Sequence, residues 1–332
     1  MSNAKKHLLT VFSTVVVAAL LLAACAGSAP APATATPMVA TPVPVTIKVA
    51  LLPIMDGLPI FVALQNGYFE ANGVTVELVP VGSAAERDQV IQGGGADAMI
   101  NDMISTALYN KDKVQVVSVG LARTATDKYP QYRILASAQS GITDVQGLKG
   151  VEIGISDGTV IAYTTDRLLQ AEGLAPADIK TVAVPKIGDR VALLGSGELK
   201  AANLPDPAAS LAINSGAVVI VDDTKHPEYG FSLYTFTASF VAAHPEAVSA
   251  FLAAVSKAAA DINADKTKWD SLLADKKLLP QPLQGNYTLP DFPTTGVPTE
   301  KQFADVLSWA KDKVIVSADE SYADSVKADF QK

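Results

Sequence analysis

The chain has 332 residues, of which 49% are hydrophobic, 18% charged and 6% aromatic, so it is long enough for two globular domains and too apolar to be disordered. Its formal net charge is −8, and removing the first 24 residues, which carry two lysines and no acid, takes it to −10. Nucleic acids are disfavoured as partners, because binding phosphate requires clustered lysines and arginines and no such cluster is visible. Cys25 is the only cysteine, which excludes an internal disulfide, a cysteine-based zinc site and an iron–sulfur cluster.

Residues 1–24 have the layout of a lipoprotein signal peptide. Two lysines precede an apolar run over residues 8–24, and small residues come directly before Cys25. The last four residues of this segment, LAAC, resemble the lipobox of bacterial lipoproteins, in which the cysteine is lipidated and becomes the mature N-terminus. We expect a lipid on Cys25, a membrane as the partner of this anchor, and an extracytoplasmic protein in the cell envelope or periplasm. A plain signal peptide and an uncleaved anchor helix are the alternatives.

Residues 25–45 are predicted to form an unpacked tether between the lipidated cysteine and the folded body. They contain five prolines with alanine, threonine and serine and carry no charge, a composition that favours an extended chain. The body then begins at residue 46, and nothing after Cys25 offers the roughly 20 apolar residues that a further membrane crossing needs. We therefore expect a soluble body held at a membrane surface.

From residue 46 onward, short β-branched runs alternate with helical stretches. In the first half, the strands predicted from this pattern are 46–53, 74–80, 96–100 and 114–122. The alternation restarts after residue 150, where the predicted strands are 151–155, 181–185, 200–204 and 217–223. One helix start, Ser83 to Glu86, fits a capping box. The pattern predicts an α/β protein of two lobes, each a mostly parallel sheet flanked by helices.

The tail of the chain is predicted to return to the first lobe. A strand-like run over residues 231–242 is followed by a helix from His244, whose one face carries Val248, Phe251, Leu252 and Val255. Lobe one then comprises residues 46–134 and 233–332, and lobe two comprises residues 135–232. The chain would cross between the lobes twice, near 133–137 and 230–236, and two crossings would form a hinge.

Four segments carry a family resemblance: LPIFVALQNGYFEANGVTVELVP, ADAMIN, DVQGLKGVEIGISDGT and GELKAANLPDPAAS. In this order they resemble the blocks of type II periplasmic binding proteins of the nitrate, sulfonate and taurine class, over roughly residues 46–260. That class includes receptors for riboflavin and for the pyrimidine precursor of thiamine. The resemblance implies a substrate-binding lipoprotein of an ABC importer, which captures a small solute between its lobes and presents it to permease subunits.

Polar residues after strand ends are the candidate ligand contacts, because sites in open α/β sheets lie at the carboxyl ends of strands or between domains. These candidates are Asp56, Asn101, Asp102, Ser105, Asp157, Thr159, Tyr163 and Asp206. Each aspartate could instead cap a helix and need no ligand. Four carboxylates facing one cleft, however, would repel one another unless they were partnered. The pattern therefore favours a donor-rich or cationic ligand.

A heterocyclic vitamin or precursor, either riboflavin or the thiamine pyrimidine, fits these residues better than a sulfonate does. A carboxylate accepts hydrogen bonds from an aminopyrimidine, and Tyr163 could stack on the ring. Further aromatic platforms considered are Tyr109, Tyr129, Tyr132, Tyr287 and Phe292. The alternative is a receptor for sulfonate, taurine or nitrate, with Arg123 or Arg133 as the anion ligand.

Catalysis is not expected from the sequence. A yeast enzyme that makes the thiamine pyrimidine shares the fold family and is the remote alternative, but its activity is associated with a cysteine-rich iron-binding motif and a sacrificial histidine. This chain has one cysteine, and its body histidines, His226 and His244, each precede a proline. No nucleophile elbow, Walker loop or H-E-x-x-H motif occurs. We therefore expect no enzymatic activity, no cofactor and no metal site; a purely structural surface lipoprotein is opposed by the two-lobe pattern.

Overall fold

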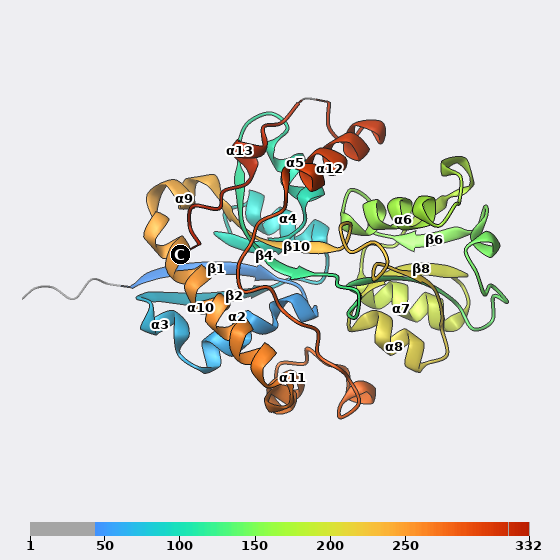
Figure 1. Ribbon diagram of the computed structural model, residues 1–332, viewed down its shortest axis with the longest axis horizontal. Coiled ribbons are helices and arrows are strands. Elements are labelled where there is room, and N and C mark those ends of the chain that lie inside the picture. The colour runs from blue at the N-terminus through green and yellow to red at the C-terminus, as the bar shows by residue number, and fades with distance from the viewer. Residues whose placement is uncertain (1–43, 318, 332) are drawn as a thin grey trace, which may run out of the picture. The chain divides into compact units, whose positions relative to one another are not determined.

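The computed structural model describes residues 44–317 and 319–331, in which the chain forms two five-stranded sheets with helices packed around them (Figure 1). The predicted signal peptide, Cys25 and almost the whole predicted tether lie outside the described residues. Within the described part, no helix is both long and apolar enough to span a bilayer. The α/β class and the mostly parallel sheets predicted from the sequence are confirmed.

The first sheet, which defines the first lobe, has the strand order β2-β1-β3-β10-β4. Its strands are β1 (Val45–Leu51), β2 (Val74–Pro80), β3 (Ala98–Asn101), β4 (Val116–Thr124) and β10 (Phe231–Thr237). Strands β2 and β3 pair parallel to β1, whereas β10 lies antiparallel between β3 and β4. Four strands therefore run in one direction, and their carboxyl ends meet at one edge of the sheet.

The second sheet, which defines the second lobe, repeats this plan with the order β7-β6-β8-β5-β9. Its strands are β5 (Tyr132–Ala136), β6 (Glu152–Ile155), β7 (Lys180–Ala183), β8 (Ala201–Pro205) and β9 (Val218–Asp222). Strand β5 is antiparallel to both β8 and β9, as β10 is to its neighbours in the first sheet. In each lobe, the antiparallel strand is the first strand that the chain forms after it crosses from the other lobe.

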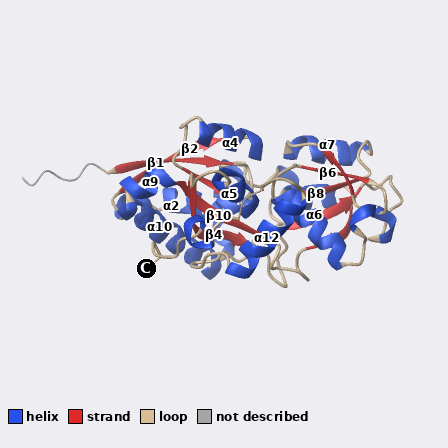
Figure 2. Ribbon diagram, turned by 90° about the horizontal axis from the view of Figure 1, so that it is seen from above, coloured by secondary structure: helices blue, strands red, loops and turns tan. Residues whose placement is uncertain are grey.

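Helices cover both faces of each sheet (Figure 2). In the first lobe they are α2 (Leu58–Gln65), α3 (Tyr68–Ala71), α4 (Ala84–Gln92), α5 (Met103–Asn110), α9 (Ala238–Ala243), α10 (Pro245–Ala264), α11 (Asp270–Asp275) and α13 (Tyr322–Ser325). In the second lobe they are α6 (Val160–Ala171), α7 (Ile187–Ser196) and α8 (Ala208–Asn214). The remaining helix, α12 (Glu300–Asp312), packs on both α5 and α6.

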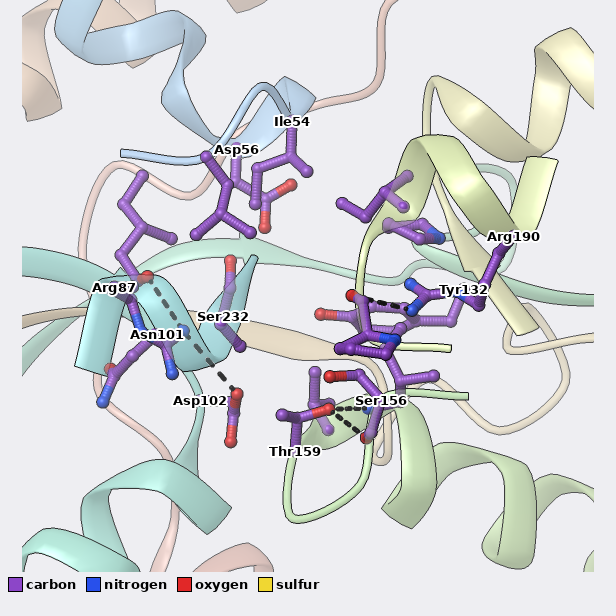
Figure 3. A pocket seen from close by; sticks show the side chains of 18 residues that line it. Ile54, Asp56, Arg87, Asn101, Asp102, Tyr132, Ser156, Thr159, Arg190 and Ser232 are labelled. Carbon is purple, nitrogen blue, oxygen red and sulfur yellow. Dashed lines mark hydrogen bonds and ion pairs between the residues drawn. The ribbon is translucent and has the colours of Figure 1, made fainter. Parts of the chain in front are cut away.

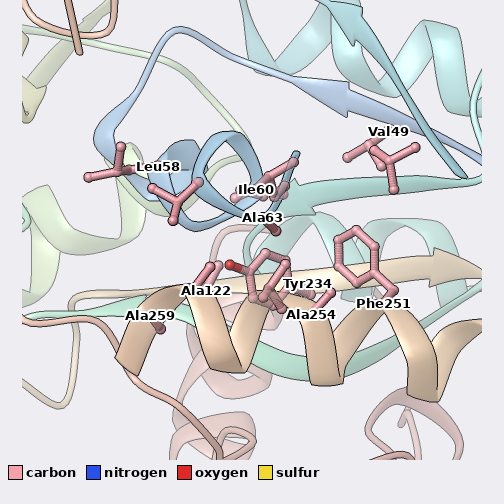
Figure 4. Packing of buried hydrophobic residues seen from close by; sticks show 14 of the residues in the cluster. Val49, Leu58, Ile60, Ala63, Ala122, Tyr234, Phe251, Ala254 and Ala259 are labelled. Carbon is pink, nitrogen blue, oxygen red and sulfur yellow. The ribbon is translucent and has the colours of Figure 1, made fainter. Parts of the chain in front are cut away.

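The largest core lies between the first sheet, α2 and α10 (Figure 4). Alternate residues of β1 face it, because Ile47 and Val49 are buried there while Ala50 faces α4 on the other side of the sheet. The ring of Phe251 on α10 stacks on Phe69 with 5.3 Å between centroids. The face of α10 predicted from the apolar spacing is thus the buried one.

Two local predictions were wrong. The strand-like run over residues 231–242 is a strand only to Thr237, whose hydroxyl accepts from the Phe240 backbone N–H and starts α9. The capping box at α4 is only half formed. Ser83 accepts from the Glu86 backbone N–H, but the Glu86 carboxylate accepts from Gly82 rather than from Ser83.

The lobe boundaries at residues 134 and 232 stay a prediction. The strands change sheet between Thr124 and Tyr132 and again between Asp222 and Phe231. These two connections, residues 125–131 and 223–230, are tied together by Asp223, whose carboxylate accepts from the backbone N–H groups of Gln131 and Tyr132 at 2.8 and 3.1 Å.

Candidate functional site

A cleft between the two lobes collects polar side chains from the carboxyl ends of both sheets (Figure 3). From the first lobe it is lined by Asp56, Arg87, Asn101, Asp102 and Ser232. From the second lobe it is lined by Tyr132, Ser156, Thr159 and Arg190. Apolar residues such as Ile54, Ile161 and Ile187 complete the wall. This is the mixed lining expected of a small-molecule site at a domain interface.

Asp56 lies in a short 3-10 helix, η2 (Met55–Gly57), which follows β1 and is buried at the cleft wall. Its carboxylate accepts from Gln131 Nε2 at 2.9 Å and lies 3.5 Å from Arg123 Nη1. Asp56 therefore does not cap a helix through its side chain. It joins the first lobe to the connection between the lobes, with its charge balanced by a buried arginine.

Asp102 follows β3 and caps α5, where its Oδ1 accepts from the Ser105 backbone N–H at 2.8 Å. Its Oδ2 lies 4.0 Å from Nη1 of Arg87, a buried residue on α4. Burial raises the pKa of the Asp102 carboxyl, and Arg87 together with the backbone N–H groups of Ser105 and Val160 opposes that shift. The capping and the cleft-lining interpretations thus hold for the same residue.

Asn101 and Thr159 line the cleft, but much of their hydrogen-bonding capacity serves the fold. Asn101 Oδ1 accepts from Thr235 at 2.6 Å, and its amide donates to Thr106 at 3.1 Å. Thr159 caps α6 by accepting from the Ile161 backbone N–H at 3.2 Å, and its hydroxyl donates to the Ser156 carbonyl at 2.8 Å.

The structure does not bring the other four predicted residues to the cleft wall. Ser105 is fully buried behind it and accepts from Arg87. Asp157 is exposed in a separate hollow beside Trp309 and Lys313, because Thr159 rather than Asp157 caps α6. Asp206 faces Arg133, Ser210 and Tyr287 in a third hollow.

Tyr163, which the sequence suggested as a stacking platform, points away from the cleft into the second lobe. Its ring packs edge-on against Tyr229 and Trp309, and its hydroxyl donates to Asp305 of α12 at 2.6 Å. Among the other aromatic platforms considered, only Tyr132 lines the cleft. Burial raises the pKa of Tyr132 well above its ordinary value, so its hydroxyl stays protonated and can donate.

The charges in the cleft differ from those expected for four unpartnered carboxylates. Asp56 is paired with Arg123, Asp102 is near Arg87, and Asp206 is paired with Arg133. The repulsion that pointed to a cationic ligand is therefore largely relieved within the protein. The two arginines considered as anion ligands, Arg123 and Arg133, are also engaged by these pairs.

Four polar residues of the cleft were not predicted: Arg87, Ser156, Arg190 and Ser232. Ser156 follows β6, so the rule that placed Asp157 in the site could have found it. Arg87 and Arg190 lie inside helices α4 and α7. Nothing in their local sequence distinguishes them from solvent-exposed helical arginines.

Comparison with known proteins gives two kinds of relative. The profile of a family described as NMT1/THI5-like matches residues 55–268. A 4-amino-5-hydroxymethyl-2-methylpyrimidine phosphate synthase of Aspergillus parasiticus is 29% identical over 213 residues, which cover 60% of this chain and 61% of that protein. The chain thus spans about three fifths of the length of this curated relative.

Solved structures share the fold at low sequence identity. The alkanesulfonate-binding protein SsuA of Xanthomonas axonopodis pv. citri, bound to MOPS, is 18% identical with a TM-score of 0.72, covering 86% of this chain and 98% of that one. The periplasmic nitrate-binding protein NrtA of Synechocystis PCC 6803 is 15% identical with a TM-score of 0.68, covering 86% of this chain and 87% of that one. These likenesses establish the periplasmic-binding-protein fold.

The expectation that the chain is not an enzyme is contradicted by its curated relatives, since three of them, at 25 to 29% identity, are named as pyrimidine phosphate synthases. That expectation depended on the single cysteine, on the two body histidines before prolines and on the lack of known catalytic motifs. These features exclude particular chemistries and do not exclude catalysis in a cleft. Among the described residues, no group of three or more histidine, cysteine, aspartate or glutamate side chains is placed to hold a metal.

Proposed function

Because the chain belongs to the NMT1/THI5-like family, we propose that its body binds a heterocyclic vitamin or precursor, riboflavin or the thiamine pyrimidine, as the solute receptor of an ABC importer. The observation that carries this proposal is the interlobe cleft, where Asp56 and Asp102 face Tyr132 and Thr159 from the other lobe. A solute held there would contact both lobes and favour their closure.

The polar groups of this cleft can complement the hydrogen-bonding groups of a pyrimidine. The Oδ2 atom of Asp102, which lies 4.0 Å from Nη1 of Arg87, can accept from a ring amino group. The protonated hydroxyl of Tyr132 can donate to a ring nitrogen. The names of the curated relatives, which refer to an aminopyrimidine, support the same ligand class.

Delivery to an importer requires the protein to be outside the cytoplasm. The predicted signal peptide and Cys25 would hold the body at a membrane surface, with the segment up to residue 45 as the tether. The partners of the protein are then its solute, the permease subunits and the membrane. The fold that it shares with periplasmic receptors supports this role.

Isothermal titration of the full-length protein tests the ligand class. The titrants are 4-amino-5-hydroxymethyl-2-methylpyrimidine, riboflavin, taurine, an alkanesulfonate and nitrate. We expect one heterocycle to bind, and Asp102→Asn to weaken it about 10- to 150-fold, because a charge-assisted hydrogen bond is lost. Asparagine still caps a helix well, so this variant should keep α5 intact.

Asp157→Asn is the matched control, since Asp157 is exposed and lies outside the cleft, and it should leave the affinity unchanged. Tight binding of taurine, the alkanesulfonate or nitrate, strengthened by Asp102→Asn, would replace this proposal with an anion receptor.

A second candidate function, synthesis of the pyrimidine phosphate, is favoured by the names of the three curated relatives. Expression of the chain in the cytoplasm of a strain that cannot make the pyrimidine tests it. Growth without added pyrimidine would support a synthase. Growth only with added pyrimidine would count against one.

A further inference from the structure

Arg190 is a buried cation at the wall of the interlobe cleft. It lies on α7 of the second lobe, only 1% of its surface is exposed, and its side chain extends toward the cleft beside Tyr132 (Figure 3). Its Nη1 donates to the backbone carbonyls of Val184 at 2.7 Å and Pro185 at 3.1 Å. Its Nε is buried and has no hydrogen-bond partner among the described residues.

Arg190 differs from every other arginine of the chain in its electrostatic surroundings. The other four, Arg87, Arg123, Arg133 and Arg167, each pair with an aspartate. Arg190 has no such pair among the described residues, and burial alone lowers its pKa to about 10. It remains a cation at neutral pH, so the fold holds an uncompensated positive charge at the cleft.

The two carbonyl contacts of Arg190 do not explain why its charge is buried at the cleft wall without an anionic partner. They tie one amino group of the guanidinium to the loop between β7 and α7, but they supply no negative charge and leave Nε unpartnered. A buried charge is costly unless it is paired and hydrogen-bonded. Groups left uncompensated in a cleft are candidates for contact with a ligand.

The opposite wall of the cleft offers a second unpartnered group. Ser232, the second residue of β10, lines the cleft from the first lobe and is 3% exposed. Its Oγ has no hydrogen-bond partner among the described residues. A hydroxyl can donate to an anion, whereas the neighbouring carboxylates of Asp56 and Asp102 cannot. The unpartnered polar groups of the cleft thus come from both lobes.

We propose that Arg190 binds an acidic group of the solute, so that the solute is a heterocycle that carries a phosphate, carboxylate or sulfonate group. The guanidinium presents donors in a planar fork that fits all three oxyanions. The heterocyclic part of this inference rests on the proposed function, whereas the acidic group rests on Arg190 itself. In this arrangement the heterocycle meets Asp102 of the first lobe and the acid meets Arg190 of the second, so one solute contacts both lobes.

Titrations with matched ligand pairs test the proposal on the full-length protein. The pairs are 4-amino-5-hydroxymethyl-2-methylpyrimidine with its phosphate ester, riboflavin with riboflavin 5′-phosphate, and ethanolamine with taurine as a pair without a heterocycle. We expect wild type to prefer the acidic member of one heterocyclic pair by about 10- to 150-fold. Arg190→Met should abolish this preference by weakening the acidic member.

Arg190→Lys keeps the charge and should retain part of the preference, and Arg167→Met, which alters an arginine outside the cleft, should retain all of it. Thermal melts check that each variant folds. If Arg190→Met does not fold, the preference of wild type and the reduced preference of Arg190→Lys still test the proposal.

Equal wild-type affinity for both members of every pair, or an undiminished preference in Arg190→Met, would overturn the proposal about the acidic group. The proposal of a heterocycle receptor would then still stand. Arg190-dependent binding of taurine with no heterocycle bound would support the role of Arg190 and reject the heterocyclic solute.

Discussion

Buried arginines lie beside the aspartates that follow strands of the first lobe, Arg123 beside Asp56 and Arg87 beside Asp102. Arg123, which is 1% exposed, lies 3.5 Å from Asp56 and donates to the carbonyl of Pro130 at 2.8 Å. Taking both charges out of water is costly, so such a pair adds little net stability compared with apolar residues of the same size. Removal of one partner is different, because it leaves the other charge buried and uncompensated.

We predict that Arg123→Met lowers the free energy of unfolding by about 3–5 kcal/mol, since it leaves the Asp56 carboxylate without its cation. Urea denaturation at neutral pH measures this change. Lys149→Met is the control, because Lys149 is mostly exposed where it meets Asp178, and it should cost about 1 kcal/mol or less. Equal costs for the two variants would mean that the Asp56–Arg123 pair is not shielded from water.

At this scale, the sequence predicts residue types and does not predict their partners. Asp56, Asn101, Asp102 and Thr159 follow strands, and the rule that parallel strands end at one edge was enough to place them at the cleft. Arg123 reaches Asp56 across 67 positions of the chain only because β1 and β4 belong to the same sheet. Such pairing depends on the completed fold, so the charge balance of the cleft could not be predicted.

At the scale of elements, the two connections between the sheets form a tightly packed crossing. The carbonyl of Gly230, at the end of the second connection, accepts from the backbone N–H of Ala125 in the first connection at 2.7 Å. A Cβ atom on Gly230 would lie 1.9 Å from Asp223 Oδ2 and 2.9 Å from the Cβ of Ala125. The crossing therefore has no room for a side chain at this position.

We predict that Gly230→Ala destabilises the protein by at least about 2 kcal/mol, because the added methyl group must displace a carboxylate that is held by two backbone N–H groups. Gly195→Ala is the control. Its Cβ would meet nothing within 4 Å, and in α7 alanine should be neutral or stabilising by up to about 1 kcal/mol. Thermal denaturation of both variants measures the effect. A melting temperature of Gly230→Ala equal to that of wild type would refute the crowding argument.

Asp223 makes the same crossing sensitive to pH. Burial raises the pKa of its carboxyl to about 7, against the opposing effects of the Gln131 and Tyr132 backbone N–H groups and of Arg123. The unfolded chain releases this proton near pH 4. The native state therefore binds more protons than the unfolded state between about pH 4 and pH 7, and the stability contributed by this group falls as pH rises through that window.

We predict that the free energy of unfolding of Asp223→Asn, relative to wild type, increases between pH 4 and pH 7 and then levels off above about pH 8. The test is the pH dependence of the free energy of unfolding rather than its absolute value, because the amide also alters the two backbone contacts. Urea denaturation of both proteins at several pH values measures this dependence. Parallel pH profiles for the two proteins would show that Asp223 titrates alike in the native and unfolded states.

The period of the apolar residues was sufficient to predict most strands and helices, including the buried face of α10. It was not sufficient to predict order within the sheets. Strand β10 inserts antiparallel between β3 and β4, more than 100 residues after either. Its pattern of buried residues would be the same at any central position of a sheet. The sequence of β10 therefore does not indicate which two strands it pairs with.

At the scale of the whole chain, α12 links the two lobes through contacts that no short-range pattern predicts. Asp305 accepts from both Tyr163 and Arg167 of α6, and Trp309 donates to Asp166 at 2.9 Å. The same helix packs on α5 of the first lobe. These side chains lie about 140 positions apart in the sequence, which explains why Tyr163 was taken for a ligand contact when its ring belongs to this interface.

We predict that Cys25→Ser moves the protein from membrane to soluble fractions and leaves solute affinity unchanged, because the body binds without its anchor. Labelling with a radioactive fatty acid and titration of the variant measure the two effects. Undiminished label in Cys25→Ser would show that Cys25 is not the lipidated residue.

In our proposal, the interlobe cleft binds a heterocyclic solute through Asp102 on one lobe and its acidic group through Arg190 on the other. Native mass spectrometry of the full-length protein tests it most directly, with an equimolar mixture of both heterocyclic pairs, taurine, an alkanesulfonate and nitrate. We predict one solute per chain, a heterocycle with an acidic group, whose adduct is lost in Asp102→Asn and retained in Asp157→Asn. A taurine, sulfonate or nitrate adduct in wild type, or no adduct at all, would contradict the claim.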